Sequence, residues 1–306
     1  MTDALRHQLK RLVSEGQNPA TQDIDLLDSN GIIELLHSQD DMVQKAISDV
    51  LPSLAQAVDW VVAALGAGGR LIYIGAGTSG RLGVLDAVEC IPTFGIPEGL
   101  VVGVLAGGEQ AMFRAQEGIE DRPEVGKADL ISHNFSRRDV LVGIAASGRT
   151  PYVLGAMAYA QAIGAKTIAL CCNPNAQLLD NADLSIVPVV GPETPAGSSR
   201  MKAGTAQKQI LNMLSTASMI RLGKCYQNLM IDVKPSNDKL RARSLNMLMQ
   251  VTGVNASCAE QALVDAGDEV KVAAFMLLKN CPAKEARMTL DKHGGFLRQA
   301  LLGLSN

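Results

Sequence analysis

Two glycine-rich segments that also carry hydroxyl groups have the residue types of loops that bind an anion. The first, residues 75–81, reads Gly-Ala-Gly-Thr-Ser-Gly-Arg and follows the apolar run 71–74. Glycines let the backbone approach a ligand closely, and a helix that begins near Ser79 presents unpaired N–H groups and the positive end of its dipole. The sequence therefore predicts that Gly77, Thr78 and Ser79 bind a phosphate group.

The second segment, residues 146–150, has similar chemistry. It reads Ala-Ser-Gly-Arg-Thr and lies between another apolar run and another predicted helix. Loops at the carboxyl ends of strands in one parallel sheet can face the same crevice and share a single phosphate. We therefore expect Ser147, Gly148 and Thr150 to bind the same anion as the first loop.

A third polar segment, residues 194–202, follows the last predicted strand and again opens a helix. Its hydroxyl groups have two interpretations, because serines before a helix also serve as caps. Because three such segments follow three strands, capping alone is the weaker explanation for the hydroxyl groups of the third segment. We expect Ser198 and Ser199 to contribute to the same site.

The first loop also satisfies the GxGxxG spacing of dinucleotide-binding loops, through Gly75, Gly77 and Gly80. A dinucleotide site further needs an acidic residue at the end of the second strand, where Glu109 is the only candidate and comes late. A dinucleotide fold does not require the second loop. On the glycine spacing alone, a nucleotide site and an unliganded turn remain alternatives to a phosphate site.

Short apolar runs that alternate with helical stretches position these loops. The runs lie at residues 71–74, 100–105, 140–145, 167–171 and 184–190. The helical stretches between them lie at residues 82–88, 111–118, 151–163 and 202–222. Continuous β-branched runs that alternate with helices indicate a parallel sheet covered on both faces, so we predict an α/β fold with a doubly wound parallel sheet.

The chain on either side of this region has helical patterns without strands. Apolar residues recur at helical spacing over 43–65, with a break expected at Pro52, after a polar stretch at 1–40. Beyond residue 225 the sequence shows dense helix punctuation: Gly253 and Gly267 as stops, Ser257 with Glu260 as a capping box, Pro282 in a first turn, and Gly294-Gly295 before a last helix. We predict a domain at 1–225 with an N-terminal helical extension, and a small helical subdomain at 226–306.

The composition favours a small-molecule partner. The chain has 306 residues, a net charge of -3 and 3% aromatic residues, so it lacks the basic field and the stacking surface of a nucleic-acid binder. It has no apolar run of about 18 residues, and residues 1–11 lack the apolar core of a signal peptide, so we expect a cytoplasmic protein without membrane attachment. Six cysteines without a CxxC pair and four scattered histidines predict reduced thiols, no metal and no cofactor.

Three longer strings carry a resemblance to a known family. Residues 75–83 (GAGTSGRLG), 143–152 (GIAASGRTPY) and 197–208 (GSSRMKAGTAQK) closely resemble the sugar isomerase (SIS) domain of N-acetylmuramic acid 6-phosphate etherases. Shorter matches at 228–230 and 293–296 extend the likeness nearly end to end. The resemblance implies an SIS-type fold and a carbon–oxygen lyase of cell-wall amino-sugar recycling. Such a lyase converts N-acetylmuramic acid 6-phosphate, a phosphorylated amino sugar, to N-acetylglucosamine 6-phosphate and D-lactate.

The same resemblance assigns the proton transfers to two carboxylates. The aldehyde of the open-chain sugar acidifies the C2 proton, so a base at C2 can expel the C3 lactyl oxygen, and water then adds to C3 with the proton transfers reversed. As the resemblance implies, Glu89 acts as the acid on the lactyl oxygen and Glu120 as the C2 base. The sequence itself supports Glu89 by its place at a helix end, where the negative dipole disfavours a merely solvated carboxylate. It supports Glu120 only through the family motif at residues 117–121 (EGIED).

Helix geometry adds a homodimer to these expectations. If residues 80–89 form one helix, Glu89 lies roughly 13 to 15 Å from the phosphate loop, which exceeds the length of a hexose phosphate. Glu89 is therefore expected to serve the loops of a second subunit. Two alternative functions stay open: an SIS regulator that binds a sugar phosphate without catalysis, and a nucleotide-dependent oxidoreductase that uses the GxGxxG glycines.

Overall fold

Five parallel strands form one sheet in the computed structural model, which describes residues 12–235 and 237–303. The strands are β1 (Leu71–Gly75), β2 (Val101–Leu105), β3 (Val140–Ile144), β4 (Lys166–Leu170) and β5 (Leu184–Ile186). Their order is β2-β1-β3-β4-β5, so the direction of winding reverses between β1 and β3. In open sheets of this kind, ligands bind at that switch point, outside the carboxyl ends of the strands. The predicted parallel α/β fold is confirmed.

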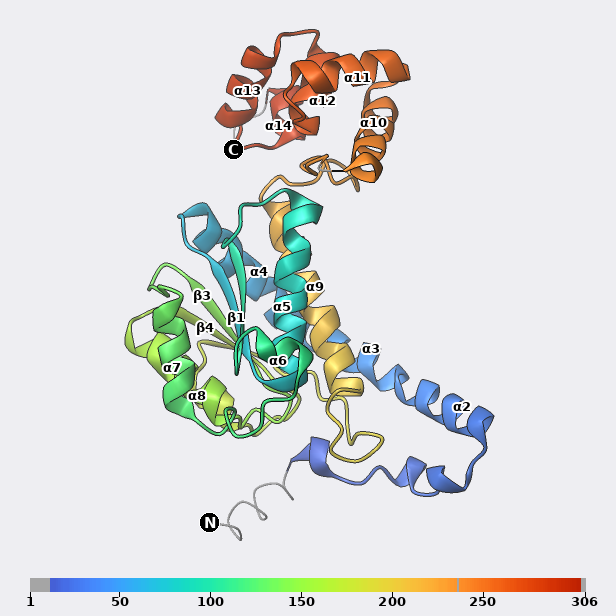
Figure 1. Ribbon diagram of the computed structural model, residues 1–306, viewed down its shortest axis with the longest axis vertical. Helices are drawn as coiled ribbons and strands as arrows, with labels where there is room; N and C mark the ends of the chain where they lie inside the picture. The colour runs from blue at the N-terminus through green and yellow to red at the C-terminus, as the bar shows by residue number, and fades with distance from the viewer. Residues whose placement is uncertain (1–11, 236, 304–306) are drawn as a thin grey trace. The chain divides into compact units, whose positions relative to one another are not determined.

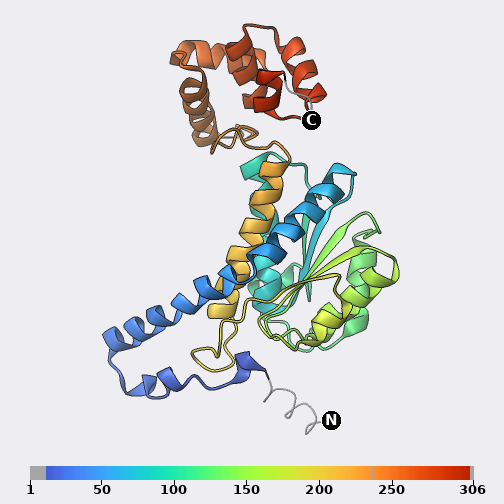
Figure 2. The same ribbon diagram turned by 180° about the vertical axis from the view of Figure 1, so that it is seen from behind.

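Helices cover both faces of the sheet, as Figures 1 and 2 show. The helices around it are α4 (Leu51–Gly66), α5 (Gly77–Phe94), α7 (Pro123–Ser132), α8 (Pro151–Ala162) and α9 (Lys202–Arg221). α8 packs on β1, β3 and β4 with α7 against it, and α4 packs on β1, β3 and β5. Every residue of β1 and of β3 is buried, which explains why these strands are continuous apolar runs in the sequence.

One buried carboxylate ties α5 to its neighbours. Asp86, which is 4% exposed, accepts a hydrogen bond from the Tyr73 hydroxyl of β1 at 2.9 Å. It also accepts hydrogen bonds from two α9 side chains, Asn212 at 2.7 Å and Ser215 at 3.0 Å. Burial raises the pKa of Asp86, although these donors oppose the shift. The network fixes the direction of the helix that begins at the first predicted phosphate loop.

The connection from β2 to β3 differs from the prediction. The helix predicted at 111–118 is wrong, because only α6 (Gln110–Phe113) is helical and the chain then runs irregularly to α7, which the sequence pattern did not reveal. Gly118 adopts the left-handed conformation (φ 80°), and Pro123 lies in the first turn of α7, where its missing N–H costs nothing. Glu120 therefore lies in a loop.

The chain before the sheet contains further helices. Three 3-10 turns, the first at Val13–Glu15, lead to α2 (Ser29–Gln39) and α3 (Asp41–Ser48). The predicted break is confirmed, since α4 begins at Leu51 with Pro52 in its first turn. The expectation about a signal peptide at 1–11 lies outside the described residues. Across the described part of the chain, no helix combines the length and apolar character needed to cross a membrane.

The chain divides into two compact units, one of residues 1–88 and 99–215, the other of residues 89–98 and 216–306. The second unit contains α10 (Asp238–Thr252), α11 (Ala256–Asp265), α12 (Val270–Lys279), α13 (Ala283–Lys292) and α14 (Leu297–Leu302). Gly253 ends α10 in the left-handed conformation, as predicted. The predicted capping box at Ser257 is wrong, because Asn255 is the N-cap of α11 and accepts a hydrogen bond from the Cys258 N–H.

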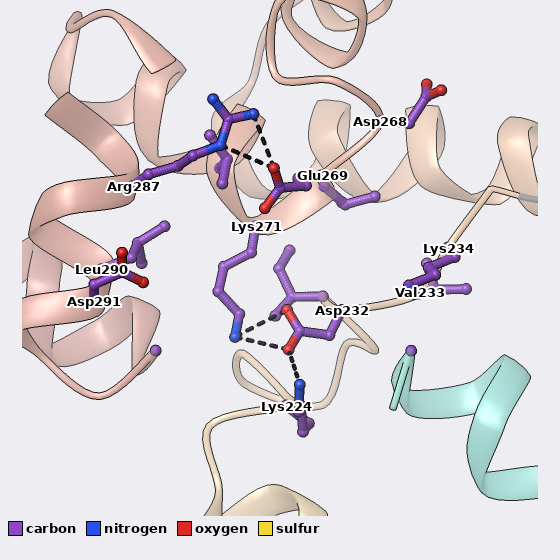
Figure 3. Close-up of a pocket in the computed structure, with 15 residues that line it drawn as sticks. Lys224, Asp232, Val233, Lys234, Asp268, Glu269, Lys271, Arg287, Leu290 and Asp291 are labelled. Carbon is purple, nitrogen blue, oxygen red and sulfur yellow. Dashed lines mark hydrogen bonds and ion pairs between the residues drawn. The ribbon is translucent and has the colours of Figure 1, made fainter. Parts of the chain in front are cut away.

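A pocket of about 320 Å³ in the second unit is held together by ion pairs (Figure 3). The Lys271 amine lies 2.8 Å from one oxygen of Asp232 and 2.9 Å from the other, and Lys224 lies 3.0 Å from the same carboxylate. Burial lowers the pKa of Lys271, and Asp232 opposes the shift. Arg287 pairs with Glu269 at 2.8 Å. These charged lining residues are thus paired with one another, so we interpret their charges as stabilising this unit.

A second buried carboxylate closes the amino ends of β1 and β3. Asp139, which is 3% exposed, accepts hydrogen bonds from the Arg70 backbone and guanidinium, each at 2.9 Å, and from the Ser136 N–H at 2.8 Å. Burial opposes the charged form of Asp139 most strongly. The hydrogen bonds and the charge of Arg70 outweigh burial and lower the pKa of the carboxyl group below its usual value.

We expect Asp139→Asn to lower the free energy of unfolding by about 2–3 kcal/mol at pH 7, because the donors of Arg70 lose a charged acceptor. A depressed folded-state pKa stabilises the fold above the ordinary aspartate pKa of 3.8, and this stabilisation is lost as the pH falls through the folded-state value. The difference between wild type and variant should therefore shrink below about pH 4. Urea denaturation at pH 7 and pH 3 measures it, with the exposed Asp25→Asn as control. A difference that is equally large at both pH values would contradict this account.

Candidate active site

A pocket of about 220 Å³ opens where the loops after β1 and β3 meet. Seven of its lining residues are site residues predicted from the sequence: Gly77, Thr78, Ser79, Glu120, Ser147, Thr150 and Ser199. Three predicted residues, Glu89, Gly148 and Ser198, are not among the lining residues. The fold thus brings the three hydroxyl-bearing segments and one of the two predicted carboxylates together in one space.

The first loop is short because its glycines touch. A Cβ atom on Gly80 would lie 2.4 Å from the Gly75 carbonyl oxygen, so only glycine allows the strand to turn directly into α5. Gly77, at the start of the helix, has φ 54°. The first turn of a helix leaves N–H groups without intrahelical partners, and they point toward the space in front of it. Ser79 is buried and hydrogen-bonded to the Gln207 amide oxygen of α9 at 2.9 Å.

The second loop also depends on a glycine. Gly148 has φ 65°, and a Cβ atom there would lie 2.3 Å from the Cβ of Ala176. Its N–H donates to Ala145 at 2.9 Å, and its carbonyl accepts from Leu178 at 2.8 Å. Gly148 therefore shapes the loop that presents Ser147 and Thr150. Direct binding of the anion by Gly148 stays a prediction.

The third segment is anchored by a buried glutamate. Glu193, 1% exposed, accepts hydrogen bonds from the N–H groups of Lys202 at 3.0 Å and Ala203 at 2.8 Å, and so caps α9. Burial raises the pKa of Glu193, and the two backbone donors oppose the shift. The cap fixes both ends of residues 194–201, which carry Ser199 into the pocket. A binding role for Ser198 stays a prediction.

Glu120 reaches the pocket from the irregular loop before α7. Its carbonyl oxygen accepts a hydrogen bond from the N–H of Tyr152, in the first turn of α8, at 3.0 Å. α7 and α8 pack closely because a Cβ on Gly155 would lie 2.0 Å from the Pro123 carbonyl oxygen. Packing between these helices therefore holds the backbone of Glu120 beside the second loop, and its side chain is exposed.

Glu89 lies farther along α5 and is exposed. Ten residues of helix separate it from Ser79, which corresponds to about 15 Å. Leu85 and Val88, on the same helix, are 48% and 57% exposed. Glu109, the acidic residue that a dinucleotide site would need, lines a different pocket of about 470 Å³. The residues that line the pocket at the ends of β1 and β3 therefore do not include Glu109, the acid that the dinucleotide alternative needs.

The structure adds lining residues that the sequence analysis did not select. Ser14 and Glu15 enter from the N-terminal segment, Asp121 follows Glu120, and Arg149 lies within the second loop. The buried Nε of Arg149 has no hydrogen-bond partner among the described residues. No local sequence signal marks Ser14 or Glu15, because contacts far along the chain bring them here. In the described residues, no group of three or more His, Cys, Asp or Glu side chains has the arrangement of a metal site.

The pocket contains two kinds of polar group, donors and carboxylates. Hydroxyl groups, free N–H groups of α5 and the Arg149 guanidinium provide donors for a phosphate dianion. Glu15, Glu120 and Asp121 provide acceptors for hydroxyl groups, and a carboxylate is also able to act as a base for proton transfer. Such a pocket suits a phosphorylated polyol that reacts at a carbon away from the phosphate.

Comparison with known proteins relates the chain to phosphosugar proteins. The model of the glucokinase regulatory protein N-terminal SIS domain matches residues 53–161, and the SIS domain model matches residues 124–217. The chain is 55% identical over 298 residues to N-acetylmuramic acid 6-phosphate etherase of Brucella anthropi, covering 97% of each chain. It is 56% identical over 299 residues to N-acetylmuramic acid 6-phosphate etherase 2 of Vibrio cholerae, covering 98% of this chain and 97% of that one.

A solved structure shares the fold. Phosphoheptose isomerase from Francisella tularensis superimposes with a TM-score of 0.51 at 19% sequence identity. The match covers 63% of this chain and 100% of that chain. It supports the SIS fold alone.

We expect Ser147→Ala to raise the Kd for a hexose 6-phosphate about tenfold, because a hydrogen bond to a charged group is lost. Isothermal titration with N-acetylglucosamine 6-phosphate measures the change. Ser132→Ala, which removes an exposed hydroxyl of α7 outside the pocket, is the matched control and should bind like the wild type. Unchanged affinity in the Ser147 variant would show that this hydroxyl does not bind the phosphate.

Proposed function

The chain belongs to the N-acetylmuramic acid 6-phosphate etherase family, and we propose that the pocket at the ends of β1 and β3 is its active site. The family is one of carbon–oxygen lyases in cell-wall amino-sugar recycling. The single observation that carries the proposal is that Glu120 and the three hydroxyl-bearing segments line one pocket. The substrate is a phosphorylated sugar, and we infer N-acetylmuramic acid 6-phosphate in its open-chain form.

In the proposed complex, the phosphate occupies the donor-rich end of the pocket. Gly77, Thr78 and Ser79 contribute backbone N–H groups, and Thr78, Ser147, Thr150 and Ser199 contribute hydroxyl groups. Fixed neutral donors bind a dianion without reorganising during the reaction. The sugar chain then extends toward the carboxylates, with C2 and C3 away from the phosphate.

The reaction we propose is an elimination followed by a hydration. The Glu120 carboxylate removes the C2 proton, the C–H electron pair forms the C2–C3 double bond, and the C3–O bond breaks. Protonated Glu89 supplies a proton to the departing oxygen, which leaves as the hydroxyl of D-lactate. Water then adds to C3 while C2 regains a proton, which gives N-acetylglucosamine 6-phosphate. Each carboxylate ends in its starting state, so the two form a matched acid–base pair.

Glu89 enters this scheme from a second subunit. It is exposed and lies about 15 Å along α5 from Ser79, more than the length of the substrate. Leu85 and Val88 are exposed on the same helix, and in the homodimer that we propose a second copy of the chain covers them. A cytoplasmic location and the homodimer both stay predictions.

Turnover in heavy-oxygen water tests the proposed reaction. Elimination followed by hydration puts the label on the C3 hydroxyl of N-acetylglucosamine 6-phosphate, because solvent oxygen is added there. Attack of water on the lactyl carbon would instead put the label in lactate. Mass spectrometry of both products distinguishes the two routes. Label confined to lactate would overturn the proposed mechanism.

We expect Glu120→Gln and Glu89→Gln each to lower kcat by a factor on the order of 10² to 10⁴, the usual scale for an acid or base. The exposed Glu117→Gln, which lies outside the pocket, is the matched control and should keep wild-type turnover. Undiminished turnover in either variant would remove that residue from the mechanism.

Mixing the two inactive variants tests the shared site. Suppose that Glu89 serves the neighbouring subunit. Each mixed dimer then has one site with both carboxylates and one with neither. Equal mixing makes about half of the dimers mixed, so about a quarter of the wild-type activity returns. Reassembly from separately tagged subunits and purification through both tags isolates the mixed species. If each subunit uses its own Glu89, the mixed dimers stay inactive.

A further inference from the structure

The N-terminal segment, residues 12–21, forms part of the proposed active site without an assigned role. Its first 3-10 turn, Val13–Glu15, carries Ser14 and Glu15 into the lining of the phosphate pocket. These residues join a pocket that is otherwise built from loops after β1, β2, β3 and β5. Since the turn is more than fifty residues from the nearest of those loops in sequence, it lies there through specific tertiary contacts.

Two sets of hydrogen bonds hold this segment in place. Asn173, 1% exposed after β4, accepts a hydrogen bond from the Ser14 N–H at 3.3 Å and donates to the Ser14 hydroxyl at 3.2 Å. The same amide donates to the carbonyl of Ala146 at 2.9 Å, so one side chain connects the segment to the second phosphate loop. The hydroxyl group of Thr194 donates a hydrogen bond to that of Thr21 at 3.2 Å. This bond ties the N-terminal segment to the third polar segment, residues 194–202.

Glu15 lies beside the third segment. Its Oε2 atom is 3.2 Å from the point that a Cβ on Gly197 would occupy, and Gly197 has φ 76°. The backbone of Gly197 thus allows a close approach that a side chain would obstruct. Glu120 lies beside the second loop instead, through its bond to Tyr152. The two carboxylates therefore reach the pocket from different elements.

A carboxylate in a pocket that binds phosphate affects free phosphate and a phosphorylated sugar differently. It repels a phosphate and accepts strong hydrogen bonds from hydroxyl groups. A site that held phosphate alone would be weakened by Glu15, whereas a site for a phosphorylated sugar gains from an acceptor placed beyond the phosphate. We infer that Glu15 is a substrate-binding residue that accepts hydrogen bonds from sugar hydroxyl groups and so distinguishes sugar phosphates from free phosphate. This inference rests on the proposed function.

The test compares two ligands on Glu15→Ala and Glu15→Gln. We expect the Kd for N-acetylglucosamine 6-phosphate to rise about tenfold in Glu15→Ala, with a smaller rise in Glu15→Gln, which keeps one acceptor oxygen. The Kd for inorganic phosphate should stay equal or fall in both variants, because a negative charge is removed. Isothermal titration provides both values, and Glu117→Gln is the matched control.

Steady-state turnover gives a second readout. KM for N-acetylmuramic acid 6-phosphate should rise about tenfold in Glu15→Ala while kcat changes by less than about threefold, since Glu15 binds substrate without transferring a proton. A purely structural role would weaken the binding of both ligands together, and would overturn the inference. Equal sugar phosphate affinity in variant and wild type would also overturn it. A wild-type protein that binds the sugar phosphate without cleaving N-acetylmuramic acid 6-phosphate would instead contradict the proposed function and leave the binding result for Glu15 intact.

Discussion

The shared carboxyl edge of two neighbouring parallel strands is the constraint on which this site depends. β1 and β3 pair so that Gly75 lies opposite Ile144, and the loops that follow them start next to each other. The first loop turns at once into a helix because Gly75 and Gly80 approach backbone to backbone. The second turns back because Gly148 is left-handed. Donors from two distant parts of the sequence thereby reach one pocket.

This pocket is suited to recognise a dianion by hydrogen bonding more than by net positive charge. Among its described lining residues Arg149 is a cation, whereas Glu15, Glu120 and Asp121 are carboxylates. Neutral hydroxyl and N–H donors at fixed positions can bind phosphate in such surroundings, because their orientation replaces charge. In the proposed reaction the carboxylates then stay available for the sugar, one for the proton at C2 and one for hydroxyl groups.

Helix α5 carries both the first loop, which we propose to bind the phosphate, and Glu89, which we propose as the acid. It begins in the phosphate loop and carries Glu89 near its other end, and its 1.5 Å rise per residue fixes their separation. Asp86 anchors its middle to β1 and α9 through three hydrogen bonds. In the proposed mechanism, the length of helix between the loop and Glu89 is the reason for a site completed by a second subunit.

The sequence by itself determined the sheet and the position of the hydroxyl-bearing loops on it. Strands buried on both faces are continuous apolar runs, and glycine with serine or threonine after such a run indicates a turn that exposes donors. It also selected Glu120, through the motif and not through periodicity. These features are local, so a short stretch of chain is enough to specify them.

Only the tertiary structure decided the rest of the site. The helix expected at 111–118 ends at Phe113, and the loop that follows leads to α7, which packs on α8 through glycines, a contact that no local pattern encodes. Glu15 reached the pocket because Asn173 binds Ser14 across 159 residues of sequence. Hydrophobic periodicity records which face of an element is buried and leaves open which distant segment covers it, so contacts of this kind appear only when the chain is folded.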